Sequence, residues 1–109
     1  MDVGFTRAGF KVLWAAEKDK AACDTYNHNA EVAVSRRLDL ETVDFDELRR
    51  ELPGPVDCLF GGPPCQGMSK VGEMRLDDPR NELVYVFMDA VDSLRPRSFL
   101  MENVDNLGT

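Results

Sequence analysis

The sequence predicts a doubly wound α/β fold, in which a parallel sheet is covered by helices on both faces. Short and nearly continuous apolar runs alternate with segments of helical periodicity. Each apolar run ends at acidic residues or at glycine and proline, which are typical of the loops between strands and helices. The length of 109 residues fits one small domain, so we expect residues 1–109 to form a single domain.

The first strand and helix are expected near the N-terminus. Residues 12–16 (VLWAA) form a continuous apolar run that is typical of a strand buried on both faces. Asp19 then stands at the N-cap position of a helix, and Cys23 and Tyr26 continue this helix at helical spacing. The helix is expected to end within residues 27–29 (NHN).

The middle of the chain carries weaker signals and then a clear strand. Residues 31–55 predict a short strand and a short helix, and Phe45, Leu48 and Leu52 indicate the helix by their spacing. Residues 56–60 (VDCLF) are a second buried-strand candidate. This run leads directly into glycines and prolines, so a loop is expected there.

A longer helix and a third strand complete the predicted sheet. Asp78 followed by Pro79 is typical of a helix start, because proline at the first helical position loses no needed N–H. Residues 98–101 (SFLM) predict the third strand. The helix between them is indicated by an apolar stripe of Leu83, Phe87, Val91 and Leu94.

The composition excludes several classes of protein. Thirteen basic and twenty acidic side chains give a net charge of −7, the wrong sign for holding nucleic acid by bulk electrostatics. Three cysteines without CxxC spacing and a single histidine favour neither a disulfide framework nor a zinc site. The cysteine usage therefore fits a reducing cytoplasm and predicts no metal. No apolar run approaches the ~20 residues of a membrane span, so we expect no membrane contact.

Three residues that follow predicted strands could carry chemistry, because parallel sheets bind ligands beyond the carboxyl ends of their strands. Cys65 lies in a proline-flanked loop and is either a thiolate nucleophile or an exposed loop cysteine. Glu102 is either a proton donor or a polar strand end, and Glu17 either grips ribose hydroxyls or lies in a solvated turn. Cys23 and Cys58 are expected in the core.

Several segments together resemble the C5-cytosine methyltransferases. Residues 61–69 (GGPPCQGMS) are similar to the family's catalytic PCQ motif, and residues 101–104 (MENV) are similar to its ENV motif. Residues 78–81 (DPRN) with Leu83 resemble the segment between these motifs, and residues 4–10 resemble the tail of the cofactor-binding motif. The resemblance spans essentially the whole chain.

The resemblance implies a partial Rossmann-like sheet of an S-adenosyl-L-methionine-dependent methyltransferase, truncated at both ends. The glycine-rich start of the cofactor motif and the target-recognition region are expected outside residues 1–109, which then form a partial catalytic domain. The implied activity is DNA (cytosine-5) methylation, as in restriction–modification systems. A methyl group would pass from S-adenosyl-L-methionine to carbon 5 of a flipped-out cytosine through a covalent Cys65 adduct.

The same resemblance implies three sets of site residues. The catalytic set is Cys65, Glu102 and Asn103. The cofactor set is Glu17, Lys18, Asp39, Leu40, Pro64 and Leu83, with Lys18 standing where many relatives have an aromatic residue. The substrate set is Gln66, Ser69 and Arg80.

Other functions are kept open. The chain could be a catalytically silent fragment, or one subunit of a split enzyme that interacts with a complementary methyltransferase fragment. It could also be an RNA cytosine-5 methyltransferase relative. If it is part of a DNA methyltransferase, its expected partner is double-stranded DNA, bound through the complete enzyme. A thiol hydrolase is disfavoured, because it needs a positioned histidine base and His28 falls on the wrong side of its strand–helix unit.

Overall fold

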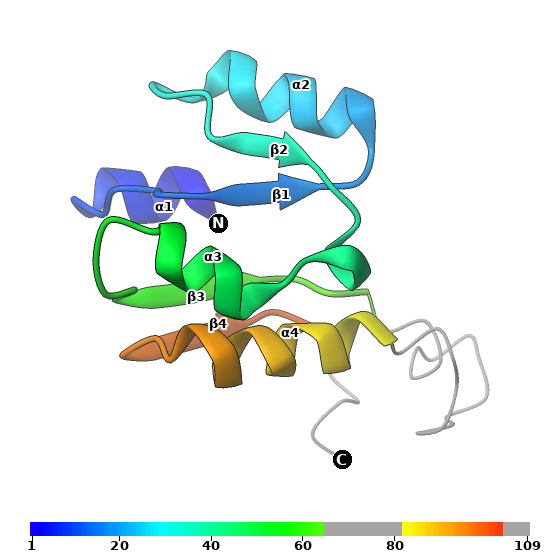
Figure 1. Ribbon diagram of the computed structural model, residues 1–109. Helices are drawn as coiled ribbons and strands as arrows, with labels where there is room; N and C mark the ends of the chain where they lie inside the picture. Colours follow the sequence, from blue (N-terminus) through cyan, green and yellow to red (C-terminus); the bar gives the residue numbers. More distant parts are fainter. Residues whose placement is uncertain (65–81, 104–109) are drawn as a thin grey trace. The chain divides into compact units, whose positions relative to one another are not determined.

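The computed structural model describes residues 1–64 and 82–103 of the chain. It is an α/β structure that forms two compact units, Met1–Asp44 and Phe45–Thr109 (Figure 1). Each unit contains one pair of parallel strands. The predicted α/β class is therefore confirmed, and the strands seen are two short pairs.

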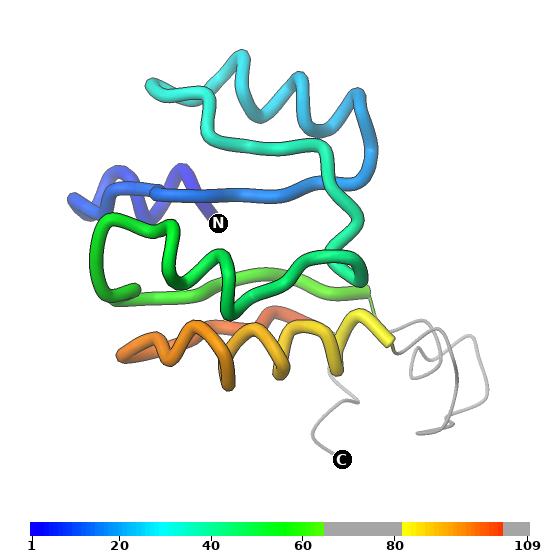
Figure 2. Tube along the Cα trace, in the orientation of Figure 1, coloured from blue at the N-terminus to red at the C-terminus, as the bar shows by residue number. Residues whose placement is uncertain are grey.

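The first unit is a strand–helix–strand arrangement. β1 (Ala15–Glu17) leads into α2 (Lys20–Asn29), and the chain returns as β2 (Ser35–Arg37) parallel to β1 (Figure 2). The register pairs Glu17 with Arg37, so both strands end at the same level. α2 packs on both strands, and the Asp19 side chain caps it by accepting a hydrogen bond of 2.8 Å from the Ala22 N–H.

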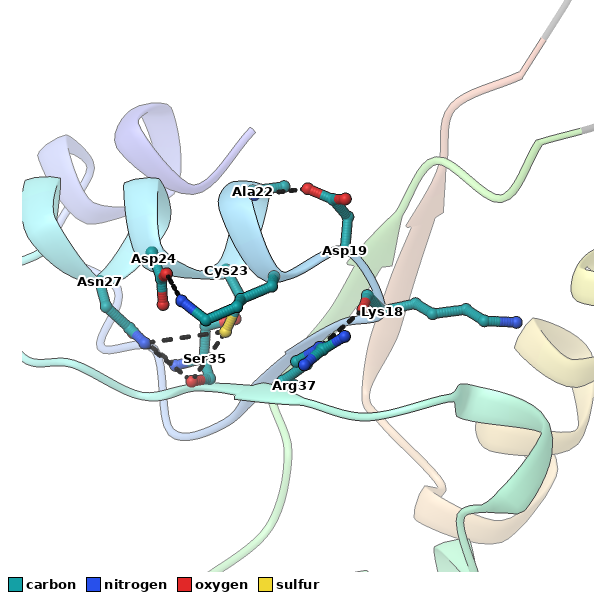
Figure 3. A network of polar contacts seen from close by, with 9 residues as sticks. Lys18, Asp19, Ala22, Cys23, Asp24, Asn27, Ser35 and Arg37 are labelled. Atoms are coloured by element: carbon teal, nitrogen blue, oxygen red, sulfur yellow. Dashed lines mark hydrogen bonds and ion pairs between the residues drawn. The ribbon is translucent and has the colours of Figure 1, made fainter.

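A polar network fixes α2 on β2 (Figure 3). The Asn27 side-chain amide donates to the Ser35 carbonyl oxygen at 2.9 Å and accepts from the Ser35 N–H at 3.0 Å. The Cys23 thiol lies 3.4 Å from the same carbonyl oxygen and is buried, as its apolar helical setting predicted. Both backbone groups of Ser35 are thus satisfied by one side chain, as a neighbouring strand would satisfy them.

Two smaller elements complete this unit. α1 (Asp2–Arg7), which the sequence patterns did not predict, is joined to α2 by a hydrogen bond from the Tyr26 hydroxyl to the Asp2 carboxylate. Burial and this bond raise the pKa of Tyr26 above its ordinary value. The 3₁₀ helix η1 (Leu40–Thr42) follows β2.

The second unit contains the other strand pair and two helices. β3 (Cys58–Gly61) runs parallel to β4 (Ser98–Met101), and α3 (Phe45–Glu51) packs against α4 (Glu82–Leu94). The two helices supply its buried apolar side chains: Phe45, Leu48, Ala90 and Leu94. Both predicted helices are therefore confirmed, although Leu52 follows the last residue of α3, and the predicted helix start at Asp78 and Pro79 lies outside the described residues.

The strand predictions were correct in position and partly wrong in detail. β4 has the predicted bounds, whereas β1 begins at Ala15 rather than at residue 12, and β3 is shifted to Cys58–Gly61. The expected burial of the strands on both faces is wrong, because β1 and β3 are half-buried and Ser98, Phe99 and Leu100 of β4 are exposed. Within the described chain each strand pairs with only one other, so each keeps an open edge. Cys58 is accordingly half-buried instead of a core residue.

The described residues contain neither a membrane-spanning helix nor a candidate metal site. None of the helices within residues 1–64 and 82–103 is long and apolar enough to cross a membrane. The same residues contain no group of three or more histidine, cysteine or acidic side chains that could hold a metal ion.

Candidate functional site

The first unit brings together the predicted cofactor residues at the carboxyl ends of β1 and β2. Glu17 ends β1 and Lys18 follows it, while Asp39 and Leu40 lie just beyond β2. The Leu38 N–H donates to the Glu17 carbonyl oxygen at 3.1 Å, which extends the strand pairing past the end of β2. Four of the six predicted cofactor residues therefore lie at one sheet edge.

Lys18 and Asp39 form an ion pair across this edge, with 2.9 Å between Nζ and Oδ2. The other Asp39 carboxylate oxygen accepts a hydrogen bond of 3.0 Å from the Glu41 N–H at the start of η1. The hydrogen bond from Lys18 lowers the pKa of Asp39, and the hydrogen bond to Asp39 raises the pKa of Lys18. The Asp39 carboxylate is thus held ionised, as a fixed acceptor for hydroxyl or N–H donors.

The sequence did not predict the ion pair of Lys18 with Asp39. It indicated only that Lys18 stands where many relatives have an aromatic residue. The sequence places a cation and an acid after two predicted strands, but only the pairing of these strands brings the two side chains together. Glu17 is half-buried, and its carboxylate accepts a hydrogen bond of 3.0 Å from the Asp19 N–H. The turn after β1 is therefore closed by the side chain that was predicted to grip ribose.

The second unit joins the two loops that follow β3 and β4. The strand register ends with Gly61 opposite Met101. Beyond it the Glu102 N–H donates to the Gly61 carbonyl oxygen at 2.9 Å, and the Asn103 side-chain amide donates to the Pro63 carbonyl oxygen at 2.7 Å. The glycine–proline loop and the Glu–Asn pair are thus held together by two hydrogen bonds.

The Glu102 carboxylate lies directly over the backbone of Gly62. A Cβ atom placed on Gly62 would stand 3.1 Å from Glu102 Oε2, closer than most real Cβ contacts. Glu102 is itself exposed, so its carboxylate is at the rim of this edge and accessible from solvent. This exposure fits the polar strand end that the sequence also allowed for Glu102, and its role as a proton donor stays a prediction.

Several predicted site residues cannot be located in this arrangement. Cys65, Gln66, Ser69 and Arg80 lie outside the described residues. Pro64 and Leu83 lie on either side of the undescribed segment, Pro64 exposed after β3 and Leu83 half-buried in the first turn of α4. Their roles toward a cofactor therefore stay predictions.

The fold and these edges define a class of protein. In each unit, charged or amide side chains follow parallel strands at their carboxyl ends, where open α/β sheets bind ligands. The acidic side chains at both edges suit a ligand with hydroxyl or amine donors. The chain is thus an α/β protein with parallel strand pairs and with polar side chains at their carboxyl ends.

Comparison with known proteins identifies the family. The profile of the C-5 cytosine-specific DNA methylases matches residues 1–109. Type II methyltransferase M.AgeI of Thalassovita gelatinovora is 44% identical over 107 residues, which cover 95% of this chain and 25% of that protein. Type II methyltransferase M1.HphI of Haemophilus parahaemolyticus is 42% identical over 111 residues, which cover 98% of this chain and 30% of that protein.

A solved structure agrees with the sequence matches. The crystal structure of a prophage-encoded E. coli protein, described as a DNA modification methyltransferase, superposes with a TM-score of 0.80 at 34% identity. The match covers 98% of this chain and 29% of that one. The chain belongs to the C-5 cytosine-specific DNA methylase family, and it spans 25% and 30% of the two type II methyltransferases.

Proposed function

We propose that residues 1–109 carry the centre of a DNA (cytosine-5) methyltransferase, as part of one catalytic domain with a Rossmann-like sheet. The observation that carries this proposal is the junction of the loops after β3 and β4. There the Glu102 N–H is hydrogen-bonded to the Gly61 carbonyl oxygen. The Asn103 side-chain amide is hydrogen-bonded to the carbonyl oxygen of Pro63, which lies two residues before Cys65. Membership of the methylase family supports the same function.

The residue types suit the chemistry of this reaction. Carbon 5 of cytosine is a poor nucleophile, so the Cys65 thiolate adds to carbon 6 and the ring electrons move toward carbon 5. Glu102 holds a proton at ring N3 and offsets the charge that develops there, while Asn103 positions the loop. After carbon 5 accepts the methyl group, its proton passes to a base. The electron pair of that bond re-forms the C5–C6 double bond as the Cys65 thiolate leaves.

S-adenosyl-L-methionine supplies the methyl group when it is bound. The residues at the edge of β1 and β2 fit it, because carboxylates accept hydrogen bonds from ribose hydroxyls and from an exocyclic amine. Glu17 would take the ribose hydroxyls, and Lys18, Asp39 and Leu40 would lie beside the adenine. Pro64 and Leu83 are further proposed cofactor contacts.

The proposed substrate is double-stranded DNA bound through the complete enzyme. Gln66, Ser69 and Arg80 would contact the flipped-out cytosine and its strand. The net charge of −7 indicates that most phosphate contacts come from regions beyond these 109 residues, or from a complementary methyltransferase fragment. The type II methyltransferase names of the relatives support a role in restriction–modification.

The proposal is tested in a complemented enzyme, in which residues 1–109 replace the matching segment of M1.HphI. DNA and RNA that carry tritium at cytosine carbon 5 are offered with and without S-adenosyl-L-methionine. We expect cofactor-dependent tritium release from DNA, because methylation displaces the carbon-5 hydrogen. Release from RNA alone would identify an RNA methyltransferase. Unmodified M1.HphI is the positive control. If it releases tritium and the complemented enzyme releases none, residues 1–109 are a silent fragment.

A further inference from the structure

We propose that Gly62 is a positioning residue for Glu102: the absence of a side chain at residue 62 leaves the space in which the Glu102 carboxyl group is held for proton donation. The inference deepens the proposed methyltransferase function and rests on it. It starts from one contact, the 3.1 Å between Glu102 Oε2 and the point where a Cβ of residue 62 would stand. The same Cβ would lie 3.7 Å from the Glu102 carbonyl oxygen and 4.0 Å from its Cβ, which are ordinary distances.

Backbone conformation does not explain the glycine at residue 62. Gly9 has a φ of 95°, in the region that favours glycine, but Gly62 does not lie in this region. The φ of Gly62 therefore gives no reason for a glycine at this residue. The close approach of the Glu102 carboxylate is therefore the structural reason that remains for a residue without a side chain.

The neighbouring glycine has a different role, which makes it a matched control. A Cβ on Gly61 would stand 3.3 Å from the Phe87 ring, and this ring packs edge-on against Phe99 with 6.2 Å between ring centroids. A side chain at residue 61 therefore disturbs packing between α4 and the strands, and its effect appears in stability. Among the described residues, the atom that a Cβ at residue 62 would approach most closely is Oε2 of Glu102, the end of an exposed, flexible side chain that can move aside.

The consequence of this difference is that Gly62→Ala should harm the reaction and leave folding intact. Glu102 is anchored at its own N–H by the Gly61 carbonyl oxygen, so its backbone stays in place. Relief of the contact must then come from a displaced carboxylate. Because misplacement of a catalytic group by about 1 Å can lower a rate by about 10²-fold, a smaller displacement should lower turnover by about tenfold.

The test compares Gly62→Ala with Gly61→Ala and Gly54→Ala in the complemented enzyme, where Gly54 has open space around it. We expect Gly62→Ala to lower kcat by about tenfold and to leave the cofactor KM and the urea midpoint unchanged. Gly61→Ala should lower the urea midpoint. Gly54→Ala should change neither kcat nor the urea midpoint. Each variant is then repeated with Glu102→Gln. With the carboxyl group gone, Gly62→Ala should lower kcat by less than about twofold, as coupled sites predict.

Two results would overturn the inference while the proposed function stands. One is a kcat for Gly62→Ala equal to that of the unsubstituted enzyme. The other is the same loss of kcat in the Glu102→Gln background, which would mean that residue 62 acts independently of the carboxylate. Absence of methyl transfer by the unsubstituted complemented enzyme would instead reject the proposed function, and the inference with it.

Discussion

The side-chain amide of Asn103 donates a 2.7 Å hydrogen bond to the carbonyl oxygen of Pro63, a residue 40 positions earlier in the chain. This bond joins the loop after β4 to the loop after β3. It holds the backbone two residues before Cys65 beside the backbone of Glu102.

Replacing Asn103 tests the junction itself. Asn103→Ala should lower the free energy of unfolding of the chain by about 0.5–1.5 kcal/mol, because the Pro63 carbonyl oxygen loses its donor. Asn103→Asp should lower it further, since a carboxylate oxygen then faces a carbonyl oxygen. Urea unfolding of the three chains measures the difference. An Asp variant as stable as the unsubstituted chain would contradict the assigned bond.

Replacing Glu102 tests the proposed proton donor. Glu102→Gln in the complemented enzyme should slow methylation by about 10²-fold or more, because a positioned acid typically contributes ~10²–10⁴-fold. Cofactor affinity, measured by titration calorimetry, should stay nearly unchanged, since this carboxyl group acts on the base. Weaker cofactor binding with an intact maximal rate would show that Glu102 has another role.

The ion pair of Lys18 and Asp39 predicts a pH dependence. Asp39 has a pKa below its ordinary 3.8, so its contribution to stability is lost as the pH falls through the lowered value. Lys18 has a pKa above its ordinary 10.5, so its contribution is lost as the pH rises through the raised value. NMR titration should show a higher pKa for Asp39 in Lys18→Met.

The matched control for this titration is Lys20→Met. Lys20 forms its ion pair with Asp24 within α2, whereas Lys18 pairs with Asp39, so removal of Lys20 should leave the pKa of Asp39 where it was. An Asp39 pKa that is the same in Lys18→Met as in the unsubstituted chain would contradict the ion pair.

Arg95 offers a test of the backbone after α4. It has a φ of 49°, a left-handed conformation that is unfavourable for a residue with a Cβ. Arg95→Gly should therefore raise the free energy of unfolding by up to about 1 kcal/mol. The substitution removes the cost of the left-handed conformation, and the greater freedom of glycine in the unfolded chain offsets part of this gain. Arg95→Ala keeps the Cβ and should bring no gain. An equal gain in both variants would point to the lost charge instead.

Local signals predicted the elements of this fold well. Asp19 marked the start of α2 because an N-cap is a contact within a few residues, and α4 was visible because its apolar stripe recurs at helical spacing. The start of β1 at Ala15 was not visible in the same way. Pairing with β2 decides where that strand begins, and pairing depends on residues far away in the sequence.

The sequence predicted which residues form the candidate site, but it did not predict the contacts between them. Strand ends pointed to Glu17 and Glu102, because polar residues after apolar runs gather at one sheet edge. The approach of Glu102 to Gly62 and the pairing of Lys18 with Asp39 depend on the register of parallel strands, which no local pattern encodes. A glycine without a special φ gives no sign in the sequence that a carboxylate lies over it.

The central claim, that Cys65 is the nucleophile of a cytosine methyltransferase, is tested most directly by covalent trapping. The complemented enzyme is incubated with S-adenosyl-L-methionine and DNA that contains 5-fluorocytosine, in which fluorine prevents loss of the carbon-5 proton and keeps the thiolate attached. We expect a complex that survives denaturation, no complex with Cys65→Ala, and an undiminished complex with Cys58→Ala, whose half-buried thiol lies within β3. Equal trapping by the two alanine variants would contradict the claim.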